Sequence, residues 1–237
     1  MPLVWQDGLR IFFAHVPKTG GSSVEDYLLQ RFGSLSIRTR PEAPGRKRDI
    51  IQSCSHLSAA DLQSLLPDRL DLCFAVVRDP ARRIISEYGF QRGISRMSRM
   101  GFSTWLHAVT AAARRDPRIY ENHIRPQGDL VPEAAEIFQL ENGLAAVVSR
   151  IDAVTGGPAP QAAMRHLLQR SGQPAVTLTR QDAALIAAFY AGDYARFGYA
   201  VPALDGLPDD HFRHLRSLLA RGLGWLIVLR HRYAWVF

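Results

Sequence analysis

The chain has 237 residues, of which 47% are hydrophobic and 22% charged, enough for one globular domain with a substantial core. Its formal net charge of +7 points to an anionic partner, such as a nucleotide, an acidic glycan, nucleic acid or a membrane surface. Two cysteines, Cys54 and Cys73, argue against a disulfide framework and a zinc site, and no apolar run is long enough to span a bilayer. The first residues carry no signal-peptide pattern, so we expect a soluble, cytoplasmic protein.

The first predicted elements are a strand at residues 11–16, a tight loop, and a helix that starts near Ser22. The loop between them carries a lysine, two glycines and three hydroxyl groups, in the order Pro17-Lys18-Thr19-Gly20-Gly21-Ser22-Ser23. Glycines permit close backbone approach and positive φ, while a helix N-terminus offers unpaired N–H groups and a positive dipole end. We expect Lys18 to supply a mobile charge and Ser22 or Ser23 to cap the helix and bind an oxygen. The pattern predicts a phosphate-binding loop.

This loop is not a Walker A motif, because Lys18 precedes both glycines instead of following the last one. An ordinary strand-to-helix turn with a solvated lysine is the alternative interpretation.

A basic, proline-containing segment at residues 38–49 follows, which predicts either a solvated surface loop or an edge that binds polyanions. Residues 50–55 then read as a short strand, and Ser58 with Asp61 predicts the start of a helix that reaches about Leu66. His56 therefore lies where a strand ends and a helix begins, which is where ligands bind in open α/β sheets.

Residues 70–77 predict a strand, and its residues 72–77 form an unbroken apolar run, as expected for a strand buried on both faces. Asp79 suits the N-cap and Pro80 the first turn of the helix that follows, to about Arg92. Arg78 at the end of the strand and Ser86 on the helix could together bind a second phosphate.

These two motifs carry a resemblance to a known family. The loop at residues 17–23 resembles the 5′-phosphosulfate loop of sulfotransferases that use 3′-phosphoadenosine-5′-phosphosulfate (PAPS). The run Arg78-Asp79-Pro80-Ala81-Arg82-Arg83-Ile84-Ile85-Ser86-Glu87-Tyr88 is similar to that family's 3′-phosphate motif. Among its members, the carbohydrate (heparan- and chondroitin-type) sulfotransferases share the His-Val-Pro-Lys-Thr-Gly-Gly form seen at residues 15–21. Weaker matches continue at residues 55–57, 123–127, 137–142 and 190–199.

The resemblance implies a P-loop-like α/β fold with a central, mostly parallel sheet flanked by helices. It implies a PAPS-dependent O-sulfotransferase acting on a carbohydrate or glycolipid hydroxyl, with no metal and no nucleic-acid partner. Lys18 would stabilise the leaving group and His56 would be the general base, since a histidine titrates near neutrality. The donor site would comprise residues 17–23, Arg78 and Ser86, with His123, Arg125 and Gln127 binding the acceptor and His123 as the second candidate base. We expect a structural role for His15, in the strand before the loop.

In the rest of the chain, residues 102–114 and 179–197 are predicted helices, the second capped by Thr179. We expect a sulfotransferase domain over residues 1–202 and a C-terminal helical, apolar and basic extension over residues 203–237, whose first helix starts near Pro208. The end of this extension could pack on the domain, form an oligomer contact, or lie on an anionic membrane at the inner face. The sequence does not set the oligomeric state.

Two further functions stay open: a small-molecule kinase on a P-loop-type scaffold, and a non-catalytic protein that binds polyanions through residues 38–48. The identity of the acceptor and the sulfated position are not encoded in any pattern of the sequence.

Overall fold

The computed structural model describes residues 1–35, 56–62, 66, 69–94, 100–159, 161–165 and 175–233. The chain forms two compact units, one of residues 1–78 and 127–169, the other of residues 79–126 and 170–237. The predicted strand at residues 50–55 and the basic segment at residues 38–49 lie outside the described residues.

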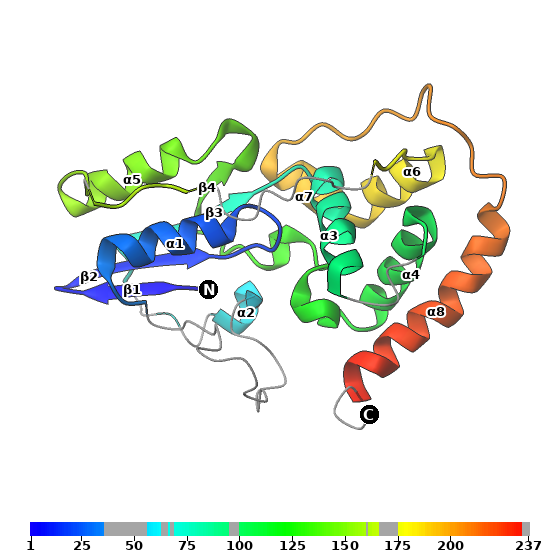
Figure 1. The fold of residues 1–237 in the computed structure, drawn as a ribbon, viewed down its shortest axis with the longest axis horizontal. Coiled ribbons are helices and arrows are strands. Elements are labelled where there is room, and N and C mark those ends of the chain that lie inside the picture. The colour runs from blue at the N-terminus through cyan, green and yellow to red at the C-terminus, as the bar shows by residue number, and fades with distance from the viewer. Residues whose placement is uncertain are drawn as a thin grey trace. The chain divides into compact units, whose positions relative to one another are not determined.

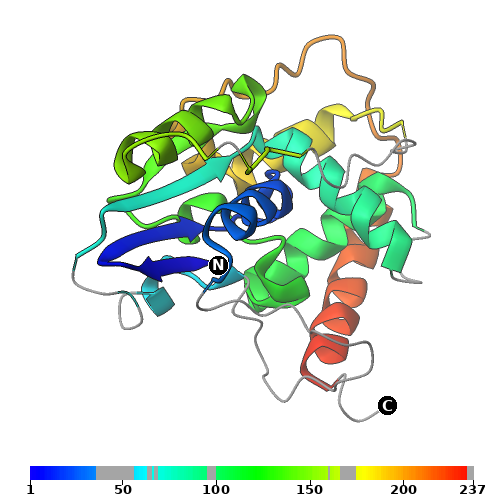
Figure 2. The ribbon, with the colours of Figure 1, turned by 60° about the vertical axis from the view of Figure 1, so that its left-hand side comes forward.

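The first unit is built on a four-stranded sheet in the order β1-β2-β3-β4, in which only the β1–β2 pair is antiparallel (Figure 1). The strands are β1 (Leu3–Gln6), β2 (Leu9–Ala14), β3 (Leu72–Val77) and β4 (Glu136–Gln139). The predicted α/β fold with a mostly parallel sheet is confirmed. The edge strand β1 was not predicted; it lies beside β2 at the blue, N-terminal end of the chain (Figure 2). The two strands are joined by Asp7 and Gly8, both at positive φ, as the tightest hairpin turns require.

Both faces of the sheet are buried, and the described residues of the unit contain three α-helices. They are α1 (Gly21–Phe32), α2 (Ala59–Leu62) and α5 (Ala145–Thr155), with short 3₁₀ turns at Gln127–Asp129 and Leu140–Asn142. Side chains of α1 and α5 share one apolar cluster with alternate residues of the strands, including Phe13 and Phe74. Phe12 and Ala75, which point to the opposite face, are fully buried as well. Ser58 caps α2 with Asp61 as predicted.

The second unit is helical. Its elements are α3 (Pro80–Ile94), α4 (Phe102–Arg115), a 3₁₀ turn (Ile119–Asn122), α6 (Arg180–Phe189), α7 (Ala191–Phe197) and α8 (Arg213–Tyr233). Trp105 of α4 and Tyr190 are fully buried in the apolar cluster that joins these helices. Pro80 opens α3 as predicted, and the Asp79 carboxylate accepts a hydrogen bond from the Arg82 N–H at 2.7 Å, which confirms Asp79 as its cap.

Two helix predictions in this unit were wrong in their bounds. The helix predicted over residues 179–197 is broken at Tyr190, whose φ of −108° and ψ of 24° leave the helical region. The buried Tyr190 hydroxyl donates to the Ile124 carbonyl at 2.8 Å, so a tertiary contact stabilises the break. The last helix starts at Arg213, not near Pro208, because Asp210 instead accepts from the Phe212 N–H and pairs with Arg216.

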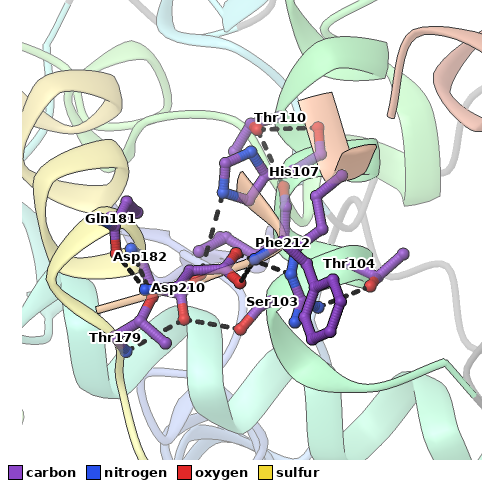
Figure 3. A network of polar contacts seen from close by, with 11 residues as sticks. Ser103, Thr104, His107, Thr110, Thr179, Gln181, Asp182, Asp210 and Phe212 are labelled. Carbon is purple, nitrogen blue, oxygen red and sulfur yellow. Dashed lines mark hydrogen bonds and ion pairs between the residues drawn. The ribbon is translucent and has the colours of Figure 1, made fainter. Parts of the chain in front are cut away.

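Helix α8 packs along α4 and belongs to the second unit. A Cβ atom at Gly224 would lie 3.2 Å from backbone atoms of Ala108 and Ala112, so glycine permits the close approach of the two helices. Arg216, in the first turn of α8, pairs with Asp210 and donates to Thr104 of α4. Asp210 belongs to a polar network with Gln181 and the capping pair Thr179 and Asp182 of α6 (Figure 3). A boundary at residue 202 between a catalytic domain and an extension stays a prediction.

Candidate active site

The loop between β2 and α1 has the geometry of an anion-binding turn. Gly20 is the N-cap of α1, with φ 83°, a left-handed conformation that glycine adopts without strain. The buried Thr19 hydroxyl donates to the Val16 carbonyl at 2.9 Å and so closes the loop on itself. Leu140, which follows the end of β4, packs against Gly20. The carboxyl ends of three parallel strands therefore meet at this loop.

Ser22 and Ser23 do not cap α1, which corrects the prediction. The helix begins at Gly21, so both serines lie inside its first turn, and no side chain caps the helix. The Ser23 N–H instead donates to the Gly20 carbonyl at 3.0 Å. The positive end of the α1 dipole thus faces the loop without a side-chain acceptor, which favours an anionic ligand there.

Gly21 is required because the His15 ring lies against it. A Cβ atom at position 21 would stand 1.9 Å from His15 Nε2 and 2.0 Å from its Cδ2. The His15 Nδ1 atom lies 2.7 Å from a carboxylate oxygen of Glu25, one helical turn after Gly21. His15 therefore braces the loop against the first turn of α1, in agreement with its structural interpretation.

His56 is connected to the same loop through the His15 backbone. Its Nδ1 atom lies 3.0 Å from the His15 carbonyl oxygen, and the two imidazole rings meet edge to face at 4.7 Å. A carbonyl oxygen only accepts, so Nδ1 of His56 carries the proton in the neutral ring and Nε2 is the basic nitrogen. The His56 side chain is buried. The strand predicted just before it, at residues 50–55, lies outside the described residues.

Arg78 directly follows β3 and reaches the phosphate-loop backbone. Its Nη1 atom donates to the Lys18 carbonyl at 3.3 Å. The buried Gln127 holds the Arg78 backbone on both sides: its amide oxygen accepts from the Arg78 N–H at 2.9 Å and its NH₂ group donates to the Arg78 carbonyl at 2.8 Å. Gln127, predicted to bind acceptor, is thus built in as a positioning residue for Arg78.

Lys18 is half-buried and has φ 68°, a left-handed conformation that is unusual for a residue with a side chain. Arg78 and the loop turn together fix its backbone, so two cationic side chains, Lys18 and Arg78, lie at the same loop. Two cations beside a helix N-terminus suit a ligand with more than one negative charge.

The comparison with known proteins assigns this site to a family. The model of the Sulfotransferase family matches residues 2–142, more than half of the chain and both phosphate motifs. The chain belongs to the sulfotransferase family. The mostly parallel sheet with flanking helices is the fold expected of a sulfotransferase. No curated protein and no solved structure matches the chain.

The remaining predicted site residues of the sulfotransferase lie in its second unit. Ser86 is buried on α3. His123 Nδ1 lies 2.8 Å from a carboxylate oxygen of Glu87, and its ring stacks on Phe90. Arg125 Nη1 donates to the side-chain oxygen of Asn122 at 3.4 Å.

Two buried residues of α3 position the segment that contains His123 and Arg125, and this role was not predicted for either of them. Arg83 is 1% exposed and donates to the carbonyl oxygens of His123 and Arg125, with its guanidinium over the Tyr190 ring. Glu87 is fully buried and accepts from Gln91 as well as contacting His123. Their spacing could have indicated a shared role, because residues four apart on a helix face the same side.

The described part of the chain contains neither a metal cluster nor a membrane span. Among the described residues, no three histidine, cysteine, aspartate or glutamate side chains are grouped so that they could hold a metal ion. No helix within the described ranges is long and apolar enough to cross a membrane.

Proposed function

We propose that this sulfotransferase transfers the sulfuryl group of PAPS to a hydroxyl group of a carbohydrate or glycolipid. The observation that carries the proposal is the β2–α1 loop, in which Gly20 at positive φ, the uncapped N-terminus of α1 and Lys18 converge beside Arg78. The close fit of Gly21 to His15 leaves the loop backbone as the surface that a phosphosulfate can approach.

The donor supplies an activated sulfuryl group on a bisphosphate leaving group. Sulfuryl transfer resembles phosphoryl transfer, in which catalysis depends mainly on positioning and on donors directed at the developing charge. In our proposal the N–H groups of the first turn of α1 and the Lys18 ammonium bind the 5′ end of the donor. Arg78 and Ser86 bind its 3′-phosphate, and the hydrogen bonds from Gln127 keep Arg78 oriented.

His56 is the proposed general base, and its Nε2 atom takes the proton of the acceptor hydroxyl. The hydrogen bond from Nδ1 to the His15 carbonyl supports this role, because it fixes both the tautomer and the ring orientation. His123 is the second candidate, held by Glu87 and Phe90. We propose that His123 and Arg125 contact the acceptor.

Calorimetric titration with 3′-phosphoadenosine-5′-phosphate tests the donor site, with AMP and ATP as controls. We expect the bisphosphate to bind the wild type and to lose at least roughly tenfold in affinity in Arg78→Ala, since a charge-assisted pair contributes about 1.5–3 kcal/mol. No binding of the bisphosphate, or a preference for ATP with Mg²⁺, would contradict the proposal and favour the kinase alternative. Salt-sensitive binding of an acidic glycan without any nucleotide requirement would favour the polyanion-binding alternative.

Transfer of labelled sulfate from PAPS to a panel of oligosaccharides and glycolipids tests the chemistry. Lys18→Ala and His56→Ala should lose turnover, and His56→Ala should still bind the bisphosphate. His123→Ala is the matched control: normal turnover of His56→Ala together with loss in His123→Ala would transfer the role of base to His123. A cytoplasmic location is also part of the proposal, and fractionation of cells that produce the full chain tests it.

A further inference from the structure

Helix α8 carries an apolar stripe that no other part of the described structure covers. Its side chains are between 42% and 68% exposed: Leu215, Leu218, Leu219, Trp225, Leu226, Leu229 and Tyr233. At about 100° per residue, these seven side chains fall within an arc of about 120°. Scattered exposed apolar residues are ordinary, but a continuous stripe along one helix marks a contact surface.

The opposite face of α8 is already used for packing. Ala220, Ile227 and Val228 are buried, and Gly224 lies against the backbone of α4. The first turn is held by Arg216, which pairs with Asp210 and donates to the Thr104 hydroxyl of α4. Asp210 and Thr104 are labelled in Figure 3. The exposed stripe therefore cannot turn into the core of this unit, because the same helix is anchored along its other side.

The charge of α8 has one sign. Residues 213–233 contain five arginines and no aspartate or glutamate. At helical spacing, Arg221 and Arg232 border one edge of the stripe, and Arg216 and Arg230 border the other. Arg216 pairs with Asp210, and Arg232 with Asp116; Arg221 and Arg230 have no acidic partner among the described residues. Arg115 of α4 lies over the ring of Trp225 and adds a further cation at the stripe.

We propose that this face of α8 binds the surface of a bilayer that contains anionic phospholipids. Leucines and a tryptophan between two rows of arginine match a helix that lies in the interface plane, with its apolar side chains among the acyl chains and its cations at the headgroups. A second copy of the chain fits less well, because pairing two such faces would bring the arginine rows together without a carboxylate from either helix. The contact is peripheral and needs no nucleotide, so its test is independent of the proposed sulfuryl transfer.

Vesicle flotation of the full chain tests the proposal. We expect the protein to float with vesicles of equal parts phosphatidylcholine and phosphatidylglycerol, to remain behind with phosphatidylcholine alone, and to be released by high salt. The double variant Leu218→Gln/Leu226→Gln should lose roughly tenfold or more in affinity through its lost apolar burial. Arg221→Gln/Arg230→Gln should lose about fivefold for each charge removed.

A matched control is Val201→Gln, which replaces an apolar side chain 59% exposed outside the stripe and should bind vesicles like the wild type. Circular dichroism checks that every variant is folded. A blue shift of the fluorescence on vesicle binding, absent in Trp225→Phe, places Trp225 in the bilayer. Equal flotation with neutral vesicles, or unchanged flotation of both double variants, would overturn the proposal. So would a wild-type dimer that becomes monomeric in Leu218→Gln/Leu226→Gln, since the face would then belong to a second copy.

Discussion

Gly21→Ala probes the contact that braces the phosphate loop. Inside an ordinary helix this change stabilises by about 0.5–1 kcal/mol, because alanine has the higher helix propensity. Here the new methyl group would lie 1.9 Å from His15 Nε2, so ring and helix must separate by about 1.5 Å to reach ordinary contact. Overpacking of this kind costs about 1–3 kcal/mol. We therefore expect Gly21→Ala to destabilise the wild type by about 1–3 kcal/mol.

The His15→Ala background isolates the cause. Without the imidazole ring the clash is absent, so Gly21→Ala should then be neutral or stabilising by up to about 1 kcal/mol. The two changes should show a coupling energy of about 1–4 kcal/mol in a double-mutant cycle. Urea unfolding of the four chains, followed by circular dichroism, measures it.

A matched substitution at the neighbouring glycine serves as the control. Gly20→Ala should cost about 1–2 kcal/mol in both backgrounds, because its penalty comes mainly from φ 83°, and the side chain nearest to the new methyl group is Leu140, not His15. If Gly21→Ala lost as much stability with His15→Ala as without it, the proposed bracing contact would be refuted.

Three further outcomes follow from single side chains. Gln127→Leu should cost about 2–4 kcal/mol and weaken bisphosphate binding, because the Arg78 N–H and carbonyl both lose their partner; unfolding and titration measure the two effects. Asp79→Ala should cost about 1 kcal/mol in a thermal melt through the lost cap on the Arg82 N–H, and Asp79→Asn much less. Burial lowers the pKa of His107 from its ordinary 6.5, so the unfolded chain binds this proton more tightly. The stability that neutral His107 contributes to the fold is therefore complete above about pH 6.5 and is lost as the pH falls below it. In urea unfolding, the free energy of unfolding of His107→Gln should decline less steeply with acidification than that of the wild type.

The phosphate loop could be predicted from the sequence because its determinants are local. Two adjacent glycines, an apolar strand before them and a helical pattern after them define the turn within a few residues, and Asp79-Pro80 does the same for α3. The cap of α1 was misassigned for an equally local reason. Gly20 at positive φ serves as the N-cap, so Ser22 and Ser23 lie inside the first turn of the helix and not at its cap position.

What the sequence could not provide were contacts between distant segments. Tyr190 continues the helical pattern of its neighbours, yet its hydroxyl binds a carbonyl 66 residues away and ends α6. Arg83 lies in a motif rich in arginine, and only its burial shows that it binds backbone carbonyls. The hairpin turn at Asp7 and Gly8 depends on local sequence instead. Asp-Gly is a known turn signal, so β1 could have been predicted from it.

Lys18 gives the loop a thermodynamic weak point. A side chain at φ 68° costs about 1–2 kcal/mol, which glycine would avoid, so the fold is less stable at this position than its backbone allows. A chain selected only for thermal tolerance would exchange this lysine for glycine. Engineering that ranks variants by melting temperature should therefore keep position 18 fixed, because the substitution that raises thermal stability there also removes the cation.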